Sequence, residues 1–86
     1  MSSVHVLYFA SFRERLQRDK ETIELSDNIK TVSDLKQFLA QRQGVWQELF
    51  NSDNSTLIAI NQSMAKNHSN LSDKDEIAFF PPVTGG

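Results

Sequence analysis

The sequence closes with the stretch Asp75-Glu76-Ile77-Ala78-Phe79-Phe80-Pro81-Pro82-Val83-Thr84-Gly85-Gly86. Residues 76–80 have the apolar and aromatic composition of a β-strand. The strand must stop at Pro81 and Pro82, because a proline has no backbone N–H to donate to a sheet ladder. The stretch therefore predicts a folded domain over residues 1–80 and a flexible, extended tail over residues 81–86.

The tail has a stiff base and an end without side chains. Pro81 and Pro82 restrict the backbone where the tail begins, and six fully extended residues reach ~20 Å. Gly85 and Gly86 suit a narrow channel in which any Cβ would collide with the walls. This pattern predicts that the tail presents its terminal carboxylate to another protein, and an inert, frayed end is the alternative.

Upstream of this stretch the chain mixes strand and helix patterns. The elements expected, in order, are a strand over residues 4–9 covered on both faces, a short helix over 10–18, a strand over 22–25, a helix that begins at Thr31, a single turn over 46–50, a strand over 57–60, a short hairpin around Met64 and a turn over 72–75. This order predicts an α+β domain in which one main helix packs across a mixed sheet.

The main helix carries the clearest local signals. Thr31 and Asp34 have the spacing of a capping box, with Asp in place of the usual Glu. The residues expected on its apolar face are Val32, Leu35, Phe38 and Leu39. Gly44 is expected to end this helix, because glycine readily adopts the left-handed backbone that follows many helices.

Composition narrows the classes of function. The 86 residues suffice for one small domain, and 9 basic and 11 acidic side chains are scattered along them. No basic patch marks a nucleic acid or a membrane surface as a partner. The absence of cysteine excludes disulfides, thiolate metal sites and a persulfide on the chain's own side chains. No apolar run approaches the ~20 residues of a membrane span, so a cytoplasmic protein is expected.

No metal or cofactor site is expected in this chain. His5 and His68 are far apart and lack metal-ligand spacing. The acidic residues 73–76 lack the glycine and the distal glutamate of a calcium loop. A glycine-rich loop with a lysine for ATP is also missing. Any ATP-dependent step would therefore belong to a partner.

Residues 75–86 strongly resemble the end of the molybdopterin synthase small subunit, the sulfur carrier of the MoaD family. Residues 4–10, 31–35 and 59–62 resemble that family's opening strand, the start of its main helix and its central hairpin. The resemblance implies a ubiquitin-like β-grasp fold. One departure is Lys74, in a turn where the family often has glycine, so a left-handed backbone would be less favourable here.

The resemblance also implies a mechanism centred on Gly86. An E1-like adenylyltransferase would use ATP to adenylate the Gly86 carboxylate, and a sulfur donor protein would displace AMP to leave a thiocarboxylate. The large synthase subunit would accept this terminus, and the sulfur would pass to cyclic pyranopterin monophosphate in molybdenum cofactor biosynthesis. Two charged carriers would be used for each molybdopterin, because the product dithiolene has two sulfurs, and the family's arrangement implies a complex of two small and two large subunits. The chain would then be a sulfur donor and not an enzyme by itself.

Residues near the tail are the candidates for contact with these partners. Gly85 must stay small beside Gly86, and the residues that would steer the tail are Pro81, Pro82, Val83 and Thr84. The body of the domain must also be gripped, so some apolar side chains of the sheet should be exposed. The candidates are Leu7, Phe9 and Phe80, for which a place in the core is an equal alternative.

Three other functions compete with this interpretation. The first is a related β-grasp carrier that supplies sulfur for thiamine or for tRNA thiolation through the same terminal chemistry. The second is a ubiquitin-like modifier that forms isopeptide bonds with lysines of target proteins. The third is a binding module with an inert tail. Residues 79–84 favour the molybdopterin branch.

Overall fold

The computed structural model describes residues 2–50 and 56–81 of the chain. The elements are β1 (Ser3–Tyr8), α1 (Ala10–Leu16), β2 (Lys20–Glu24), α2 (Val32–Ala40), α3 (Val45–Phe50), β3 (Leu57–Ile60), β4 (Ser63–Ala65) and β5 (Glu76–Phe80). The strands form one sheet in the order β2-β1-β5-β3-β4. The pairing of β1 with β5 is parallel and the other pairings are antiparallel. The predicted α+β domain with a mixed sheet is confirmed.

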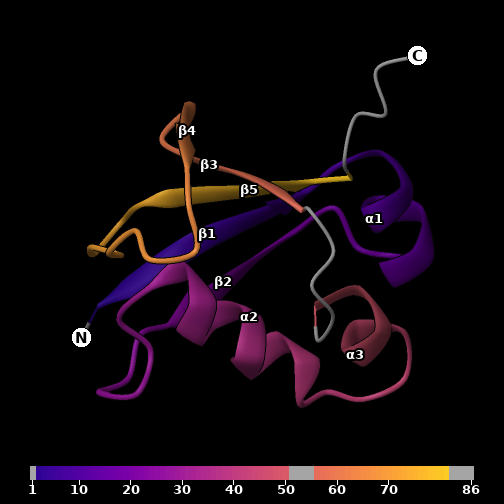
Figure 1. Cartoon of the computed structure of the whole chain (residues 1–86), viewed down its shortest axis with the longest axis horizontal. Helices are drawn as coiled ribbons and strands as arrows, with labels where there is room; N and C mark the ends of the chain where they lie inside the picture. Colours follow the sequence, from indigo (N-terminus) through magenta and orange to yellow (C-terminus); the bar gives the residue numbers. More distant parts are fainter. Residues whose placement is uncertain (1, 51–55, 82–86) are drawn as a thin grey trace.

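The core fills the space between the sheet and the helices. Figure 1 shows α2 and α3 on one side of the sheet. The most completely buried side chains come from β1, β5 and α2: Val4, Val6, Tyr8, Ile77, Phe79, Val32, Leu35 and Leu39. Alternate residues of a strand point to opposite faces, so this layer covers only one face of the sheet. We call the face turned away from α2 the outer face.

The first strand is not covered on both faces, and that prediction is wrong. Val4, Val6 and Tyr8 are buried, whereas His5 and Phe9 on the other side of the backbone are exposed. The physical reason is that α2 and α3 both lie on one side of the sheet. An apolar run therefore places part of its hydrophobic surface on the uncovered outer face.

The capping box that begins α2 is confirmed. The Thr31 hydroxyl accepts a hydrogen bond from the Asp34 N–H at 3.2 Å. The Asp34 carboxylate accepts from the N–H groups of Lys30 and Thr31 at 2.9 and 3.1 Å. These backbone hydrogen bonds lower the pKa of Asp34 below its ordinary value. The helix start is thus fixed by three residues that lie within the segment 30–34.

The end of α2 differs from the prediction. The helix ends at Ala40, before Gly44, and the backbone of Gln43 (φ 67°) and Gly44 (φ 62°) is left-handed. The chain therefore leaves the helical path before the glycine, which lies in the turn that leads to α3. Phe38, expected on the apolar face, is 37% exposed, while Leu35 and Leu39 are fully buried.

The other predicted elements are present with shifted ends. The short helix ends at Leu16, where Gln17 (φ 53°) turns the chain, and the second strand begins at Lys20. The single turn predicted over residues 46–50 is α3. None of the helices in the described part of the chain is long and apolar enough to span a membrane.

Two tight turns join the strands around β5. Asn61 (φ 51°) and Gln62 (φ 71°) form the two-residue connection between β3 and β4. The Asn61 side chain donates to the Asp75 carboxylate at 2.9 Å and accepts from the Glu76 N–H at 3.0 Å. The backbone of Lys74 is left-handed, with φ 70°. This is the conformation that suits the glycine that the resembling family often has at this position. These contacts fix the start of β5.

Candidate functional site

The centre of the sheet leads directly to the tail. Strand β5 lies between β1 and β3 and ends at Phe80, and the half-buried Pro81 follows it. On one side of β5, the Phe9 N–H donates to the Phe79 carbonyl at 3.2 Å. On the other side, Leu57 of β3 pairs with Phe80. The last strand is therefore held on both sides up to its final residues. The chain leaves the sheet at its middle strand.

The predicted carrier residues lie beyond this point. Pro82, Val83, Thr84, Gly85 and Gly86 are outside the described residues, so their roles stay predictions. Pro81 is the one tail residue within the described ranges. The division into a domain over residues 1–80 and a tail over 81–86 likewise stays a prediction.

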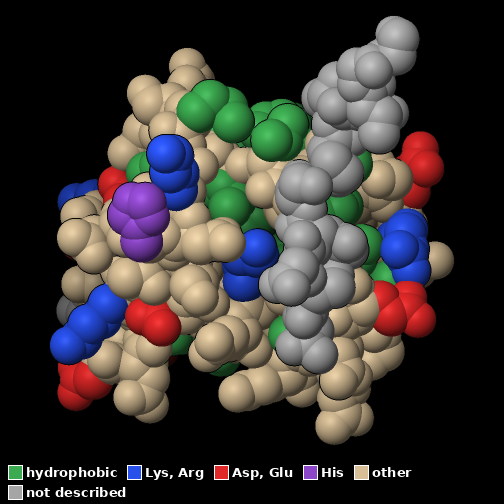
Figure 2. All heavy atoms as spheres, in the orientation of Figure 1, with side chains coloured by type: hydrophobic (Ala, Val, Ile, Leu, Met, Phe, Trp, Pro, Cys, Tyr) green, Lys and Arg blue, Asp and Glu red, His purple; other side chains and the backbone are tan. Residues whose placement is uncertain are grey.

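An apolar surface surrounds the base of the tail on the outer face. Its members, which we call the outer patch, are Leu7, Phe9, Leu57, Ala59, Met64, Ala78 and Phe80; the small Ala59 and Ala78 are buried, at 7% exposure each, and the others are half-buried or exposed. The sheet register places Leu7 beside Ala78, Ala78 beside Ala59 and Ala59 beside Met64. The row therefore runs across four strands, and hydrophobic side chains gather near β3 and β4 in Figure 2.

Two phenylalanines form the end of the outer patch beside Pro81. The rings of Phe9 and Phe80 are stacked with centroids 4.8 Å apart and planes 8° apart. Phe9 is 37% exposed and Met64 is 68% exposed, while Phe80 and Leu7 are half-buried. Monomeric proteins rarely leave a contiguous patch of this kind uncovered unless it binds something.

The structure brings together the three body residues that the sequence suggests for partner contact. Leu7, Phe9 and Phe80 all lie on the outer face and not in the core between the sheet and the helices. Their placement makes them available to a partner. That a partner binds them stays a prediction.

A polar network on the helical side of the sheet was not anticipated from the sequence. The Glu21 carboxylate accepts from the Tyr8 hydroxyl at 2.7 Å, from Arg42 at 2.8 and 2.9 Å and from Arg18 at 2.9 Å. The Arg42 guanidinium lies 4.5 Å from the ring centroid of Trp46. These residues are distant in sequence and carry no shared motif, so the pattern offered no signal for them.

The network keeps its members in fixed ionisation states. Burial and the hydrogen bond to Glu21 raise the pKa of Tyr8 well above its ordinary value. Burial favours the neutral form of Glu21, but hydrogen bonds from Arg42 and Tyr8 outweigh it and lower the pKa of the carboxyl. Tyr8 therefore stays protonated and Glu21 stays ionised near neutral pH. The network connects β1, β2 and the segment that follows α2.

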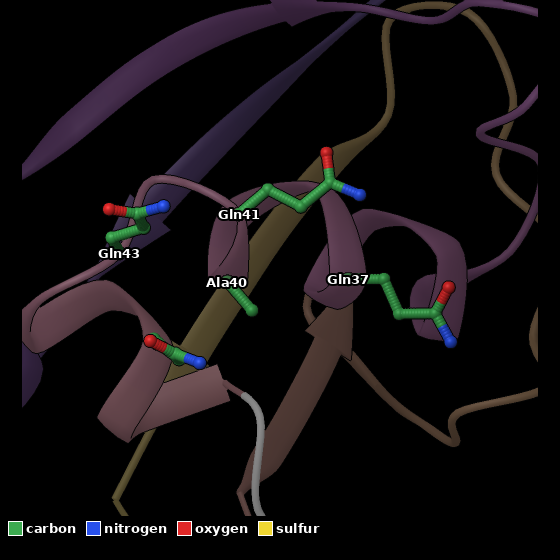
Figure 3. A pocket seen from close by; sticks show the side chains of 5 residues that line it. Gln37, Ala40, Gln41 and Gln43 are labelled. Carbon is green, nitrogen blue, oxygen red and sulfur yellow. The ribbon is translucent and has the colours of Figure 1, made fainter.

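The hollow between α2 and α3 also lacks the groups for catalysis. Figure 3 shows the five side chains that line it, which are Gln37, Ala40, Gln41, Gln43 and Gln47. The amides are neutral, so they supply neither an acid nor a base. Across residues 2–50 and 56–81, no three His, Asp or Glu side chains gather as metal ligands.

Comparisons with known proteins show the family to which the chain belongs. The ThiS family matches residues 6–86. The molybdopterin synthase sulfur carrier subunit of Haemophilus influenzae is 41% identical over 83 residues, which cover 96% of this chain and 99% of that protein. The protein of the same name from Escherichia coli is 40% identical with the same coverage.

Solved structures show the same fold. Putative molybdopterin converting factor subunit 1 from Pyrococcus furiosus is 30% identical, with a TM-score of 0.75 over 96% of this chain and all of that chain. Subunit 1 in a complex with subunit 2 of the molybdopterin-converting factor from Helicobacter pylori is 26% identical, with a TM-score of 0.66 over 98% and 99%. The small archaeal modifier protein SAMP1 from Methanosarcina acetivorans is 27% identical, with a TM-score of 0.74 over 100% and 98%.

The fold of these proteins confirms the predicted ubiquitin-like β-grasp topology. Nearly full-length identity to two sulfur carrier subunits confirms the resemblance seen in residues 75–86. The match to the family model also includes the terminal glycines. The chain belongs to the ThiS family, within which it is similar to the molybdopterin synthase sulfur carrier subunits.

Proposed function

We propose that the chain carries sulfur for molybdopterin synthesis as a thiocarboxylate on Gly86. The observation that carries the proposal is the alignment with two molybdopterin synthase sulfur carrier subunits, which spans 96% of this chain and 99% of each relative. The match to the ThiS family also reaches residue 86. The residues matched to the family therefore include the terminal Gly85 and Gly86.

The chemistry of a carboxylate sets the order of the proposed steps. A carboxylate is a poor electrophile, so its oxygen must first become a good leaving group. Reaction with ATP gives an acyl-adenylate and pyrophosphate, and attack by sulfide sulfur then releases AMP and leaves a thiocarboxylate. The thiocarboxylate sulfur then bonds to a carbon of cyclic pyranopterin monophosphate, and water hydrolyses the acyl–sulfur bond, which leaves the sulfur on the substrate and returns the carboxylate. Two carriers are consumed for each dithiolene.

The described residues support a carrier that depends on partners for catalysis. Glu21 and Tyr8 are locked in a hydrogen-bonded network, and the sequence has no glycine-rich loop for ATP. We therefore assign adenylation to an E1-like adenylyltransferase, sulfur supply to a donor protein and the final transfer to a large synthase subunit. The location that we propose for this cycle is the cytoplasm.

The outer patch is the proposed docking surface for the large subunit. It meets Pro81 at the stacked rings of Phe9 and Phe80, so a protein that covers it also lies at the base of the tail. The Helicobacter pylori neighbour was solved as a complex of subunits 1 and 2. For this chain we propose the same kind of pair, assembled as two small and two large subunits.

Intact mass spectrometry tests the carrier chemistry. The purified chain is incubated with the E1-like enzyme of the same organism, ATP and inorganic sulfide. We expect a mass gain equal to the difference between sulfur and oxygen, localised to Gly86 by fragmentation. The matched variant Gly86→Ala should keep the thermal midpoint of the wild type but show impaired activation. An unchanged mass of the wild type with an active enzyme would refute the proposal.

The same experiment separates the competing functions. A ubiquitin-like modifier, the function named for the Methanosarcina acetivorans neighbour, would instead give covalent adducts of high mass with lysines of other proteins. A carrier for thiamine or tRNA thiolation would gain the same sulfur but would not support molybdopterin formation when mixed with the large subunit. An inert tail would tolerate blocking of Gly86 in every assay.

A further inference from the structure

One of the two outermost strands of the sheet, β2, has an unpaired edge. Strand β2 pairs with β1 on one side and is the last strand of the sheet on the other. The Leu25 N–H donates to the Ser2 carbonyl and the Tyr8 N–H donates to the Asp19 carbonyl, each at 2.8 Å. Hydrogen-bonded pairs alternate along an antiparallel ladder, so the odd-numbered residues of β2 bond to β1.

The even-numbered residues of β2 therefore point their backbone groups away from the sheet. These residues are Lys20, Thr22 and Glu24. Among residues 2–50 and 56–81, no backbone hydrogen bond meets their outward N–H and C=O groups. An edge of this kind is a template for another strand.

The side chains along this edge are charged in a self-complementary order. Lys20 and Glu24 are exposed, and neither forms an ion pair within the described part of the chain. They lie four residues apart on one strand, or ~13 Å at the rise of an antiparallel strand, so they cannot pair with each other. The sequence from 20 to 24 thus leaves one positive and one negative charge at opposite ends of a short strand.

A second copy of the same strand satisfies both the backbone and the charges. Two β2 strands can pair antiparallel about a two-fold axis that passes between the two Thr22 residues. Lys20 of each copy then lies opposite Glu24 of the other. All three outward residues then fall in hydrogen-bonded positions, where each facing pair exchanges two N–H···O bonds. Opposite charges and paired threonines at facing positions both stabilise such ladders.

Apolar side chains beneath the edge add to the surface that a second copy would cover. A groove between β2 and α2 includes Leu25, Ile29 and Phe38 in its lining, with Arg42 at its side. Phe38 is 37% exposed there, although Leu35 and Leu39 of the same helix are fully buried. A strand added to β2 would lie along this groove and shield part of it from water.

We propose that two copies of this chain associate through antiparallel β2–β2 pairing centred on Thr22, which joins their sheets into one. The interface is a single short strand from each copy, so the dimer is weak and depends on concentration, as contacts below ~1,200 Å² of total buried area usually are. β1 separates this edge from β5, so the association leaves the end of β5 and the outer patch of each copy accessible. The inference does not depend on sulfur transfer.

Charge exchange at the two ends of the strand tests the register. Sedimentation velocity is measured on the full chain up to about 1 mM, the range in which weak complexes form. Lys20→Glu places two carboxylates opposite each other at both ends, and Glu24→Lys places two ammonium groups there. We expect each single variant to weaken the dimer at least tenfold. The double variant Lys20→Glu/Glu24→Lys restores both pairs and should dimerise like the wild type.

A mixture of the two single variants provides the sharpest control. One variant then presents two acidic and the other two basic positions, so they should form a heterodimer although neither forms a homodimer. Thr22→Pro removes an outward N–H on an edge strand, where proline is tolerated, and should give a folded monomer by circular dichroism. A wild type that stays monomeric at about 1 mM, or single variants that dimerise as well as the wild type, would overturn the proposal.

Discussion

Replacement of Lys74 by glycine should stabilise the domain. Lys74 has φ 70°, a left-handed backbone that costs a residue with a Cβ roughly 1–2 kcal/mol. Its N–H donates to the Ser3 carbonyl at 2.6 Å, and glycine retains this bond. Glycine also increases the entropy of the unfolded chain, which offsets about 0.5–1 kcal/mol of the gain. The expected net increase in the free energy of unfolding is about 0.5–1 kcal/mol.

Urea denaturation of the wild type, Lys74→Gly and Lys74→Ala measures this effect. With a slope of about 1 kcal/mol per molar urea for a small domain, the glycine variant should unfold at a midpoint ~0.5–1 M higher with an unchanged slope. The alanine variant removes the same long side chain but keeps the Cβ and hence the strain. Its midpoint should stay close to that of the wild type. Equal gains in both variants, or no gain with glycine, would refute the argument from backbone strain.

Three further predictions concern the helix cap, the polar network and the outer patch. Thr31→Ala removes the acceptor of the Asp34 N–H and should lower the free energy of unfolding by about 1 kcal/mol in urea titrations. Folding lowers the pKa of Glu21, so the ionised carboxylate stabilises the fold fully above its ordinary pKa of 4.5. This stabilisation is lost as the pH falls through the lowered pKa. Thermal melts across that pH range should therefore show that the stability difference between the wild type and Glu21→Gln shrinks on acidification. Phe9→Ser should leave the thermal midpoint nearly unchanged yet weaken binding to the large synthase subunit at least tenfold by calorimetry, and an unaltered affinity would remove Phe9 from the proposed docking surface.

Local signals in the sequence predicted the parts of the fold that depend on neighbouring residues. The capping box at Thr31 and Asp34 involves a spacing of three residues, and the structure contains it. The left-handed backbone of Lys74 was indicated by the glycine that the resembling family often has at this position and not by the lysine itself. The strand that ends before Pro81 follows from the missing N–H of proline. In each case the cause lies within a few residues of the effect.

Features that depend on distant residues could not be predicted in this way. Glu21 meets Tyr8 and Arg42 only after the strands and helices have packed, and nothing in their spacing marks them as partners. The position of Phe38 at the rim of the core depends on how α2 lies across the sheet. The apolar run over residues 4–9 has the composition of a covered strand, but composition does not reveal that helices protect only one of its faces.

The wrong prediction for the first strand is the observation that connects fold to function. A strand with Leu7 and Phe9 on an uncovered face is unfavourable for an isolated domain unless another protein covers that face. The same face carries Phe80, whose backbone continues into Pro81 and the tail. The residues proposed to hold a partner and the chain segment proposed to react with it are therefore linked by one central strand. The affinity of the domain for the large subunit and the reactivity of Gly86 can then be varied separately. Phe9→Ser should impair docking to the large subunit while Gly86 remains chemically intact. Gly86→Ala should impair activation while the docking surface remains complete.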